Sequence, residues 1–359
     1  MNYLENYGVQ QRFMNEATLY PEYSLARVIA QHKGMYRIIT AEGERFAVIS
    51  GKLSYEIETL SHYPAVGDFV MISIGNINSP SIIHAVLTRK SVFQRTALGP
   101  ANQTQVIAAN IDIVFICMSL NHNYNLSRLE RYLSIAWDSG ATPVIILTKS
   151  DLCENVPQIL SEIETVALGC DVMVTSSSNA STVKNLYSFL KKGITASFIG
   201  SSGVGKSTLI NLLAEKQLLS TNEIDQYDKG RHTTTGREML LLPNGAIVID
   251  TPGMRELGVT HADVGKTFSD IEKLAKQCKF RNCSHTNEPG CAVQKAILDG
   301  ELDERRLRSY DKLKREAKYD GLSSKEIEEE KLNEMFREIG GMKKAKHHIK
   351  NLKKSKPRY

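Results

Sequence analysis

The sequence contains Gly200-Ser201-Ser202-Gly203-Val204-Gly205-Lys206-Ser207, which matches the phosphate-loop pattern G-x-x-x-x-G-K-[ST]. An apolar run over residues 196–199 comes directly before it, and a helix is predicted over residues 208–214. A strand, a glycine-rich loop and a helix in this order are the context in which the pattern binds nucleotide phosphates. We therefore predict an α/β domain with a phosphate loop, rather than a Gly/Ser-rich loop that matches by chance.

The loop residues have separate expected roles. The glycines let backbone N–H groups point at the phosphates, and the N-terminus of the following helix adds partial positive charge. Lys206 is expected to reach the β- and γ-phosphates, and Ser207 is expected to ligate Mg²⁺. We assign nucleotide binding to every residue from Gly200 to Thr208.

A second phosphate-side motif, Asp250-Thr251-Pro252-Gly253, ends the apolar run 246–249. An Asp at the end of a strand beside a phosphate loop holds Mg²⁺, usually through water. The backbone N–H of Gly253 is expected to approach the γ-phosphate. A simple Pro-Gly turn is the alternative, but the position of the motif on the next apolar run favours the nucleotide role.

Between these motifs, residues 229–237 (KGRHTTTGR) are polar and rich in threonine. One hydroxyl among Thr233, Thr234 and Thr235 could complete the Mg²⁺ shell when the γ-phosphate is present, as in the switch loops of GTPases. Thr234 and Thr235 are the two candidates, and a plain polar surface loop is the alternative. We take Ser207, Thr234 and Asp250 as the expected Mg²⁺ ligands.

The motif Thr148-Lys149-Ser150-Asp151 follows the apolar run 143–147 and resembles the Asn-Lys-x-Asp base motif of GTPases. Asp151 can accept hydrogen bonds from N1–H and N2–H₂ of guanine, a donor pair that adenine lacks. Lys149 can lay its stem along the base, whereas Thr148 replaces the Asn that normally contacts N7. We therefore expect GTP and GDP as ligands, with lower affinity but retained selectivity. The sequence Thr175-Ser176-Ser177 could bring backbone N–H groups to the guanine oxygen.

The motifs follow one another in a permuted order. In an ordinary GTPase the phosphate loop comes first and the base motif last. Here the base motif at Thr148 precedes the phosphate loop at Gly200, and Asp250 comes last. Because the same sheet can form from either order, we predict a circularly permuted GTPase domain.

Four residues with metal-ligand chemistry lie within fourteen positions: Cys278, Cys283, His285 and Cys291. Three thiolates and one imidazole fill the four positions of a tetrahedral zinc site and leave none open for a substrate. We predict one structural Zn²⁺ here. The alternative is three buried cysteines beside an incidental histidine.

The flanks of the GTPase motifs complete the predicted fold. Short β runs over 26–30, 35–39, 46–49, 69–72 and 82–87 predict a small barrel, either an OB-fold or an SH3-like barrel.

After residue 258 the chain becomes charged, and exposed helices are expected over 301–313 and 324–339. The predicted fold is multidomain. Residues 1–92 hold an N-terminal extension and the OB-fold, residues 93–257 the permuted α/β P-loop domain, and residues 258–359 a helical zinc-binding domain with a basic tail.

Composition limits the class of protein. With 42% hydrophobic and 24% charged residues, the 359-residue chain can form ordinary cores. We find no run of 18 apolar residues and no secretory signal pattern, so we expect a cytoplasmic monomer without membrane contact. In that reducing compartment Cys117, Cys153 and Cys170, in or beside apolar runs, are expected to be core residues.

Positive charge is concentrated in the last residues of the sequence. Residues 341–359 hold seven Lys and one Arg with no acidic residue, whereas the whole chain carries a net charge of +5. Such a block suits the phosphate backbone of a nucleic acid, and a solubilising tail is the alternative.

This set of motifs resembles the ribosome small-subunit-dependent GTPase A family (RsgA, also called YjeQ). The likeness rests on a barrel before the permuted motifs, on Arg231-His232-Thr233-Thr234-Thr235, on Asp250-Thr251-Pro252-Gly253 and on the cysteine cluster with Glu288-Pro289-Gly290-Cys291. The resemblance implies binding to the 30S ribosomal subunit and its 16S rRNA, a late role in subunit maturation, and GTP hydrolysis stimulated by the subunit. The rival functions are a GTP-dependent switch on a different RNA or ribonucleoprotein, and a non-enzymatic nucleotide-binding module.

Hydrolysis also needs a group that aligns the attacking water. Ras-type GTPases use a Gln directly after the Asp-x-x-Gly motif, and Met254 stands in that place here. A thioether cannot orient water, so the free enzyme is expected to be slow. Lys206 and His232 are the catalytic candidates, and packing or RNA contact is the alternative role for His232.

Overall fold

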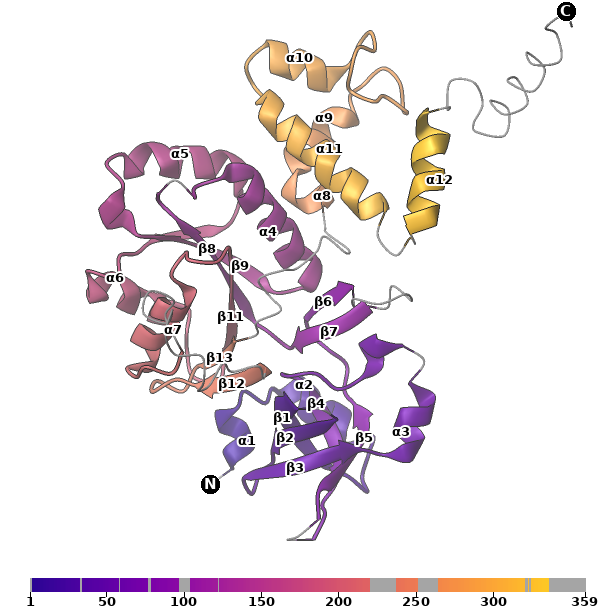
Figure 1. Cartoon of the computed structure of the whole chain (residues 1–359), viewed down its shortest axis with the longest axis vertical. Coiled ribbons are helices and arrows are strands. Elements are labelled where there is room, and N and C mark those ends of the chain that lie inside the picture. The colour runs from indigo at the N-terminus through magenta and orange to yellow at the C-terminus, as the bar shows by residue number, and fades with distance from the viewer. Residues whose placement is uncertain are drawn as a thin grey trace, which may run out of the picture.

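The computed structural model describes residues 2–32, 34–57, 59–76, 79–96, 104–121, 123–219, 237–250, 264–319, 322 and 324–335. Three parts follow one another along the chain: a β-barrel, an α/β sheet with helices on both faces, and a group of helices (Figure 1). In Figure 1 the barrel lies at the bottom, the α/β part in the middle and the C-terminal helices at the top. This is the multidomain fold class that the sequence predicts.

The N-terminal barrel consists of five strands that close on themselves. Its strands are β1 (Ser24–His32), β2 (Met35–Ile39), β3 (Glu44–Ile49), β4 (Phe69–Ser73) and β5 (Ser81–Val86). Their order is β1-β2-β3-β5-β4, and β4 pairs back to β1. The short helices α3 (Gly51–Glu56) and η1 (Leu60–His62) connect β3 to β4. Buried side chains such as Val28, Ile38 and Ile72 fill the interior. The predicted OB-type barrel is thus confirmed.

The α/β part is built on a sheet of order β10-β9-β8-β11-β13-β12. Its parallel strands are β8 (Ile113–Ser119), β9 (Thr142–Thr148), β10 (Asp171–Val174), β11 (Thr195–Ile199) and β13 (Ile247–Asp250), and β12 (Arg237–Leu241) joins antiparallel. The bounds of β9, β11 and β13 agree with the predicted apolar runs 143–147, 196–199 and 246–249 to within one residue.

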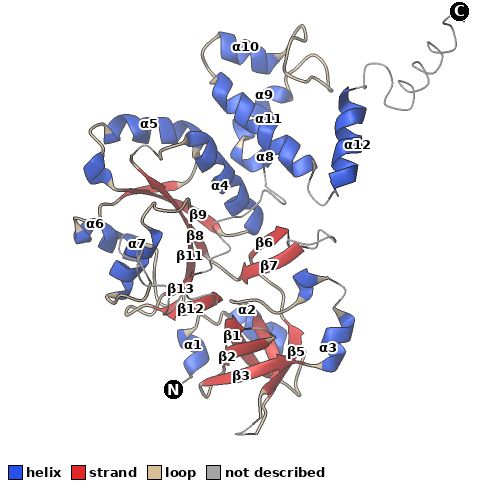
Figure 2. Ribbon diagram, viewed as in Figure 1, coloured by secondary structure: helices blue, strands red, loops and turns tan. Residues whose placement is uncertain are grey.

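Helices cover both faces of this sheet (Figure 2). They are α4 (Leu126–Ser139) and α5 (Val156–Val166) on one face, and α6 (Ala180–Lys184), η3 (Asn185–Ser188) and α7 (Lys206–Ala214) on the other. Along β8, Val114 and Ile116 belong to the core under α4, whereas Phe115 and Cys117 belong to the core under α7. Because side chains alternate along a strand, only a continuous apolar run can bury both faces.

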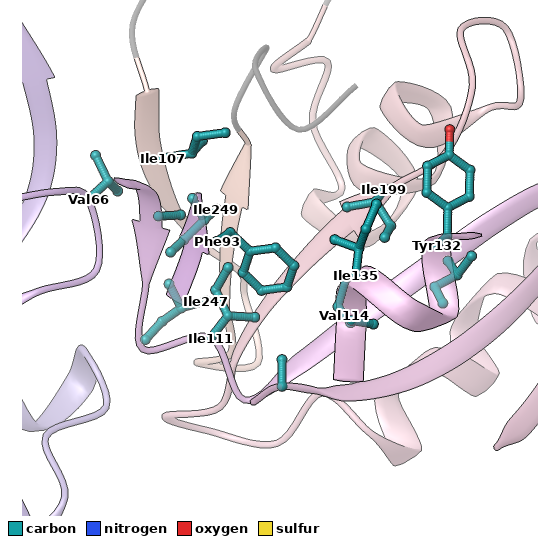
Figure 3. Packing of buried hydrophobic residues seen from close by; sticks show 14 of the residues in the cluster. Val66, Phe93, Ile107, Ile111, Val114, Tyr132, Ile135, Ile199, Ile247 and Ile249 are labelled. Atoms are coloured by element: carbon teal, nitrogen blue, oxygen red, sulfur yellow. The ribbon is translucent and has the colours of Figure 1, made fainter. Parts of the chain in front are cut away.

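The barrel and the α/β sheet are joined by strand pairing and by a shared core. Strand β1 pairs with β12, with Ala30 opposite Glu238, so the two parts form one continuous sheet. A hairpin of β6 (Val92–Thr96) and β7 (Thr104–Ala109) contributes to the same core. Figure 3 shows Phe93 of this hairpin beside Ile247 and Ile249 of β13. The sequence patterns predicted none of β6, β7 and β12.

The residues before the barrel form the short helices α1 (Tyr3–Asn6) and α2 (Gln11–Ala17). Arg27 of β1 is fully buried and fixes these two helices to the barrel and to the α/β part. Its guanidinium donates to the backbone carbonyls of Tyr7, Gly67 and Asn110. Burial lowers the pKa of Arg27 to about 10, although Asp112 and Asp68 oppose the shift. One side chain therefore joins the N-terminal helices, a barrel turn and the start of the α/β part.

The C-terminal helices form a separate small core. They are α8 (Val264–Thr267), α9 (Ser269–Ala275), α10 (Ala292–Leu298), α11 (Glu304–Lys318) and α12 (Ser324–Met335). Helix α11 buries Leu307, Tyr310 and Leu313 against Phe268. A helix is present where one was predicted over 301–313, but the prediction that it is exposed was wrong, because one face buries this apolar stripe while charged residues cover the outer face. The predicted end of the last helix, residues 336–339, lies outside the described residues.

A buried ionic cluster fixes these helices to α4. The carboxylate of Glu130 on α4 is fully buried and pairs with Arg305 and Arg306 of α11, at 3.0 and 2.9 Å. Arg306 also pairs with Asp270 of α9 at 2.7 Å.

Among the described helices, none is both long and apolar enough to cross a membrane.

Candidate functional site

The phosphate-loop stretch lies between β11 and α7, where the sequence places it. Gly200, Gly203 and Gly205 have φ of 141°, 75° and 98°, which favour glycine. A Cβ on Gly200 would lie 2.3 Å from the carbonyl oxygen of Cys117, so β8 passes too close for a side chain. A Cβ on Gly203 or Gly205 would meet no atom within 4 Å. The loop therefore has one packed side and one open side, as a phosphate cradle requires.

Lys206 begins α7 and is buried. Its Nζ donates to the carbonyl oxygens of Gly200 and Ser201, at 2.7 and 2.6 Å, so the ammonium group lies across the loop. An ammonium group held by neutral carbonyls can exchange them for phosphate oxygens, which are stronger acceptors, as the predicted contact with the β- and γ-phosphates would require.

A residue that no motif indicated also contacts the loop. Arg128 of α4 donates from Nη1 to the hydroxyl of Ser201 at 2.8 Å, and it is held by the side chain of Asn123. Arg128 and Ser201 are 73 positions apart, so only the packing of α4 beside the loop brings them together. The guanidinium adds a second positive charge next to Lys206.

The expected Mg²⁺ side is partly described. Asp250 is the last residue of β13, which runs parallel to β11, so it lies at the same edge of the sheet as the phosphate loop. Ser207 and Thr208 lie in the first turn of α7. His232, the threonines Thr233, Thr234 and Thr235, Gly253 and Met254, and the basic residues 341–359, lie outside the described residues.

The base motif lies at the end of β9, beside the phosphate loop. The hydroxyl of Thr148 donates to the carbonyl oxygen of Val204 at 2.6 Å. Lys149 has φ 57° and ψ 41°, which turns the chain out of the strand. Asp151 is exposed, and the hydroxyl of Ser176 donates to its Oδ1. The structure thus brings together the base motif, the Thr175-Ser176-Ser177 segment and the phosphate loop.

The cysteine cluster forms a compact site between α9 and α10. The ligand atoms of Cys278, Cys283, His285 and Cys291 all lie within 4.8 Å of one another. Cys278 Sγ lies 3.9 Å from Cys291 Sγ, and a tetrahedral zinc with Zn–S bonds of about 2.3 Å needs sulfur atoms about 3.8 Å apart. This donor set and this spacing fit a metal ion.

Neighbouring groups support this cluster. Burial raises the pKa of the Cys278 thiol, but hydrogen bonds from the backbone N–H groups of Ala292 and Val293 outweigh it, and the pKa lies below its ordinary value. The carboxylate of Glu288 accepts from the backbone N–H groups of Ser284 and Thr286 at 2.7 and 3.0 Å. With the Ser284 hydroxyl, these bonds lower the pKa of Glu288 to about 2.

The other three cysteines are free thiols and contribute to the apolar cores, as expected. Burial raises the pKa of Cys117 to about 12 and that of Cys170 to about 11. These thiols stay protonated at neutral pH, which agrees with a packing role.

The fold and the converging loops define a circularly permuted P-loop GTPase domain between an OB-type barrel and a helical part with a metal-ligand cluster. A family model described as RsgA GTPase matches residues 86–260. The protein named small ribosomal subunit biogenesis GTPase RsgA 2 from Lactiplantibacillus plantarum is 46% identical over 344 residues, covering 96% of this chain and 97% of its own. Its counterpart RsgA 1 from Listeria innocua is 47% identical over 319 residues, covering 88% and 90%.

Two solved structures share the fold. YjeQ from Thermotoga maritima matches with a TM-score of 0.62 and 24% identity, covering 82% of this chain and 98% of its own. YloQ, described as a circularly permuted GTPase, matches with a TM-score of 0.58 and 24% identity, covering 82% and 95%. The chain belongs to the RsgA GTPase family, and it is a GTP-hydrolysing enzyme.

Proposed function

We propose that this GTPase binds the 30S ribosomal subunit through its 16S rRNA, acts late in the maturation of that subunit, and hydrolyses GTP faster when bound to it. The observation that carries the proposal is the near full-length likeness to relatives named small ribosomal subunit biogenesis GTPases. That likeness includes the barrel and the C-terminal helices, which nucleotide hydrolysis alone does not need. We place this monomeric enzyme in the cytoplasm.

The proposed nucleotide site consists of three loops. The phosphates lie against the loop from Gly200 to Thr208, with the backbone N–H of Gly253 at the γ-phosphate. The guanine base lies against Thr148, Lys149, Ser150 and Asp151. The base motif after β9 contacts the phosphate loop after β11, and Ser176 after β10 contacts Asp151, which supports this assignment.

Two metal ions complete the proposed enzyme. Ser207, Thr234 and Asp250 would hold Mg²⁺ together with the nucleotide, and the bound ion would neutralise charge that develops on the phosphates. One Zn²⁺ is held by the cluster of Cys278, Cys283, His285 and Cys291. It is structural, because four protein ligands leave no open position.

The first experiment measures GTP turnover of the full-length protein alone, with purified 30S subunits, with 50S subunits and with a free RNA unrelated to 16S rRNA. We expect stimulation by 30S subunits and none by 50S subunits. The variant Lys206→Ala should remove turnover in every mixture, which shows that the signal arises at this site. Equal stimulation by free RNA would favour the alternative, a switch on a different RNA, and no stimulation would contradict the proposal.

His232 is the proposed group that aligns the attacking water, because Met254 cannot do so. The variant His232→Ala should bind GTP normally but lose most of the turnover stimulated by the subunit. Nucleotide affinity measured with a fluorescent GDP analogue separates binding from turnover. Unchanged stimulated turnover would exclude this role for His232.

A further inference from the structure

The contact between the base motif and the phosphate loop determines how the base is read. Thr148 is 4% exposed, and its hydroxyl lies 2.6 Å from the carbonyl oxygen of Val204. The carbonyl oxygen of Met118, at 3.5 Å, is its second polar neighbour. Both neighbours are carbonyls, which can only accept hydrogen bonds. The Thr148 hydroxyl must therefore be the donor.

A threonine hydroxyl has a single proton to donate, and this one is used by Val204. The hydroxyl oxygen of Thr148 then has only its lone pairs left, and these can accept a hydrogen bond but cannot donate one. Guanine N7 is itself an acceptor without a hydrogen. Two acceptors cannot form a hydrogen bond, so Thr148 cannot recognise N7 while it holds the phosphate loop.

An asparagine at this position would not face the same choice. Its carboxamide carries two N–H donors, so it can bind a backbone carbonyl with one and guanine N7 with the other. The threonine keeps the bond that fixes the base motif to the phosphate loop, and it gives up the bond to the base. The burial of Thr148 strengthens this conclusion, because breaking the bond to Val204 would leave a buried carbonyl unpaired.

We infer that residue 148 leaves N7 of the guanine base unread, and that selectivity rests on the Watson–Crick edge through Asp151. The inference deepens the proposed binding of guanine nucleotides and rests on it. The recognised ligand class is accordingly wider than guanine itself. It includes purine nucleotides with the guanine N1–H, N2–H₂ and O6 pattern but a carbon at position 7.

The test compares GDP with 7-deaza-GDP, in which a C–H group replaces N7, by competition against a fluorescent GDP analogue on the full-length protein. We expect the two dissociation constants to agree within about twofold, because no protein donor at residue 148 is lost. An affinity for 7-deaza-GDP lower by fivefold or more would overturn the inference. ADP serves as the third competitor. If ADP binds as well as GDP, it is the guanine assignment that fails.

Two variants make the test independent of a single comparison. Thr148→Asn should create discrimination, with GDP bound roughly three- to tenfold more tightly than 7-deaza-GDP. Thr148→Ser keeps the hydroxyl and should behave like the unmodified protein. If Thr148→Asn does not fold, the comparison on the unmodified protein still decides. Discrimination that exceeds fivefold and is the same in the unmodified protein and in both variants would show that another group reads N7, and it would overturn the inference.

Discussion

Asp151 carries the proposed selectivity for guanine, and Ser176 orients its carboxylate by donating a hydrogen bond to Oδ1. The variant Asp151→Asn replaces an acceptor by a donor, which matches the carbonyl at position 2 of xanthine. We expect GTP affinity to fall by roughly 10- to 100-fold, while xanthosine triphosphate gains. Competition binding with both nucleotides measures the change. Asp171→Asn, an exposed residue at the start of β10, is the control, and a retained preference for GTP would disprove the base assignment.

Glu288 provides a second test at the level of a single side chain. Its carboxylate fixes the backbone on both sides of His285, through Ser284 and Thr286. The variant Glu288→Ala should weaken zinc binding by roughly tenfold, because the ligands lose their preset positions. Titration with a competing chelator gives the affinity. The exposed Glu301→Ala in the same domain should leave it unchanged, and equal affinities in the two variants would argue against a role for Glu288.

The residues that sequence could identify are those in local motifs. Gly200, Lys206 and the cysteine cluster belong to short patterns whose spacing already reflects the chemistry. Arg128 and the partner of Thr148 could not be found in this way. Their contacts join residues 73 and 56 positions apart, and they depend on how α4 and β9 pack beside the phosphate loop.

Helix α4 is the element that connects the phosphate loop to the C-terminal helices. Arg128 near its start contacts Ser201, and Glu130 pairs with Arg305 and Arg306 of α11. Removing Glu130 would leave two arginines without a shared buried partner. The variant Glu130→Ala should therefore lower the free energy of unfolding by about 3 kcal/mol.

Helix α4 also offers a matched control for this prediction. Arg131 pairs with Glu316 at 3.0 Å, but both side chains are about one-third exposed. Arg131→Ala should cost no more than about 1 kcal/mol, because water screens the pair. Urea denaturation of the two variants compares their stabilities. Similar losses would mean that the buried cluster adds nothing beyond an ordinary surface pair.

At the level of elements, apolar periodicity predicted the strands buried on both faces and the barrel strands. It missed β12 because Glu238 interrupts its apolar pattern, and the strand takes its place by pairing with both β13 and β1. It also missed the burial of one face of α11, where charged residues conceal a stripe of Leu307, Tyr310 and Leu313. The amino-acid composition of such a helix is dominated by its charged outer face. Only the spacing of its apolar residues indicates the buried face.

The apolar cores of the molecule indicate which of its parts unfold together. One apolar cluster extends from Ile29 and Phe69 of the barrel through Phe93 to Ile249 of the α/β sheet. The C-terminal helices have a core of their own, centred on Phe268, and their described contacts with α4 include the buried ionic cluster. We therefore expect the barrel and the α/β part to unfold together and the C-terminal helices to unfold separately.

Calorimetry of the full-length protein tests this expectation. GDP with Mg²⁺ at about 100 times its dissociation constant adds about 2.7 kcal/mol, which should raise the larger transition by roughly 5–10 °C. A zinc chelator should lower the smaller transition and leave the larger one in place, because the cysteine cluster belongs to the small core. The variant Cys278→Ser should reproduce the chelator effect without chelator. A single transition that GDP raises and the chelator lowers would instead mean that the ionic cluster on α4 couples all three parts into one cooperative unit.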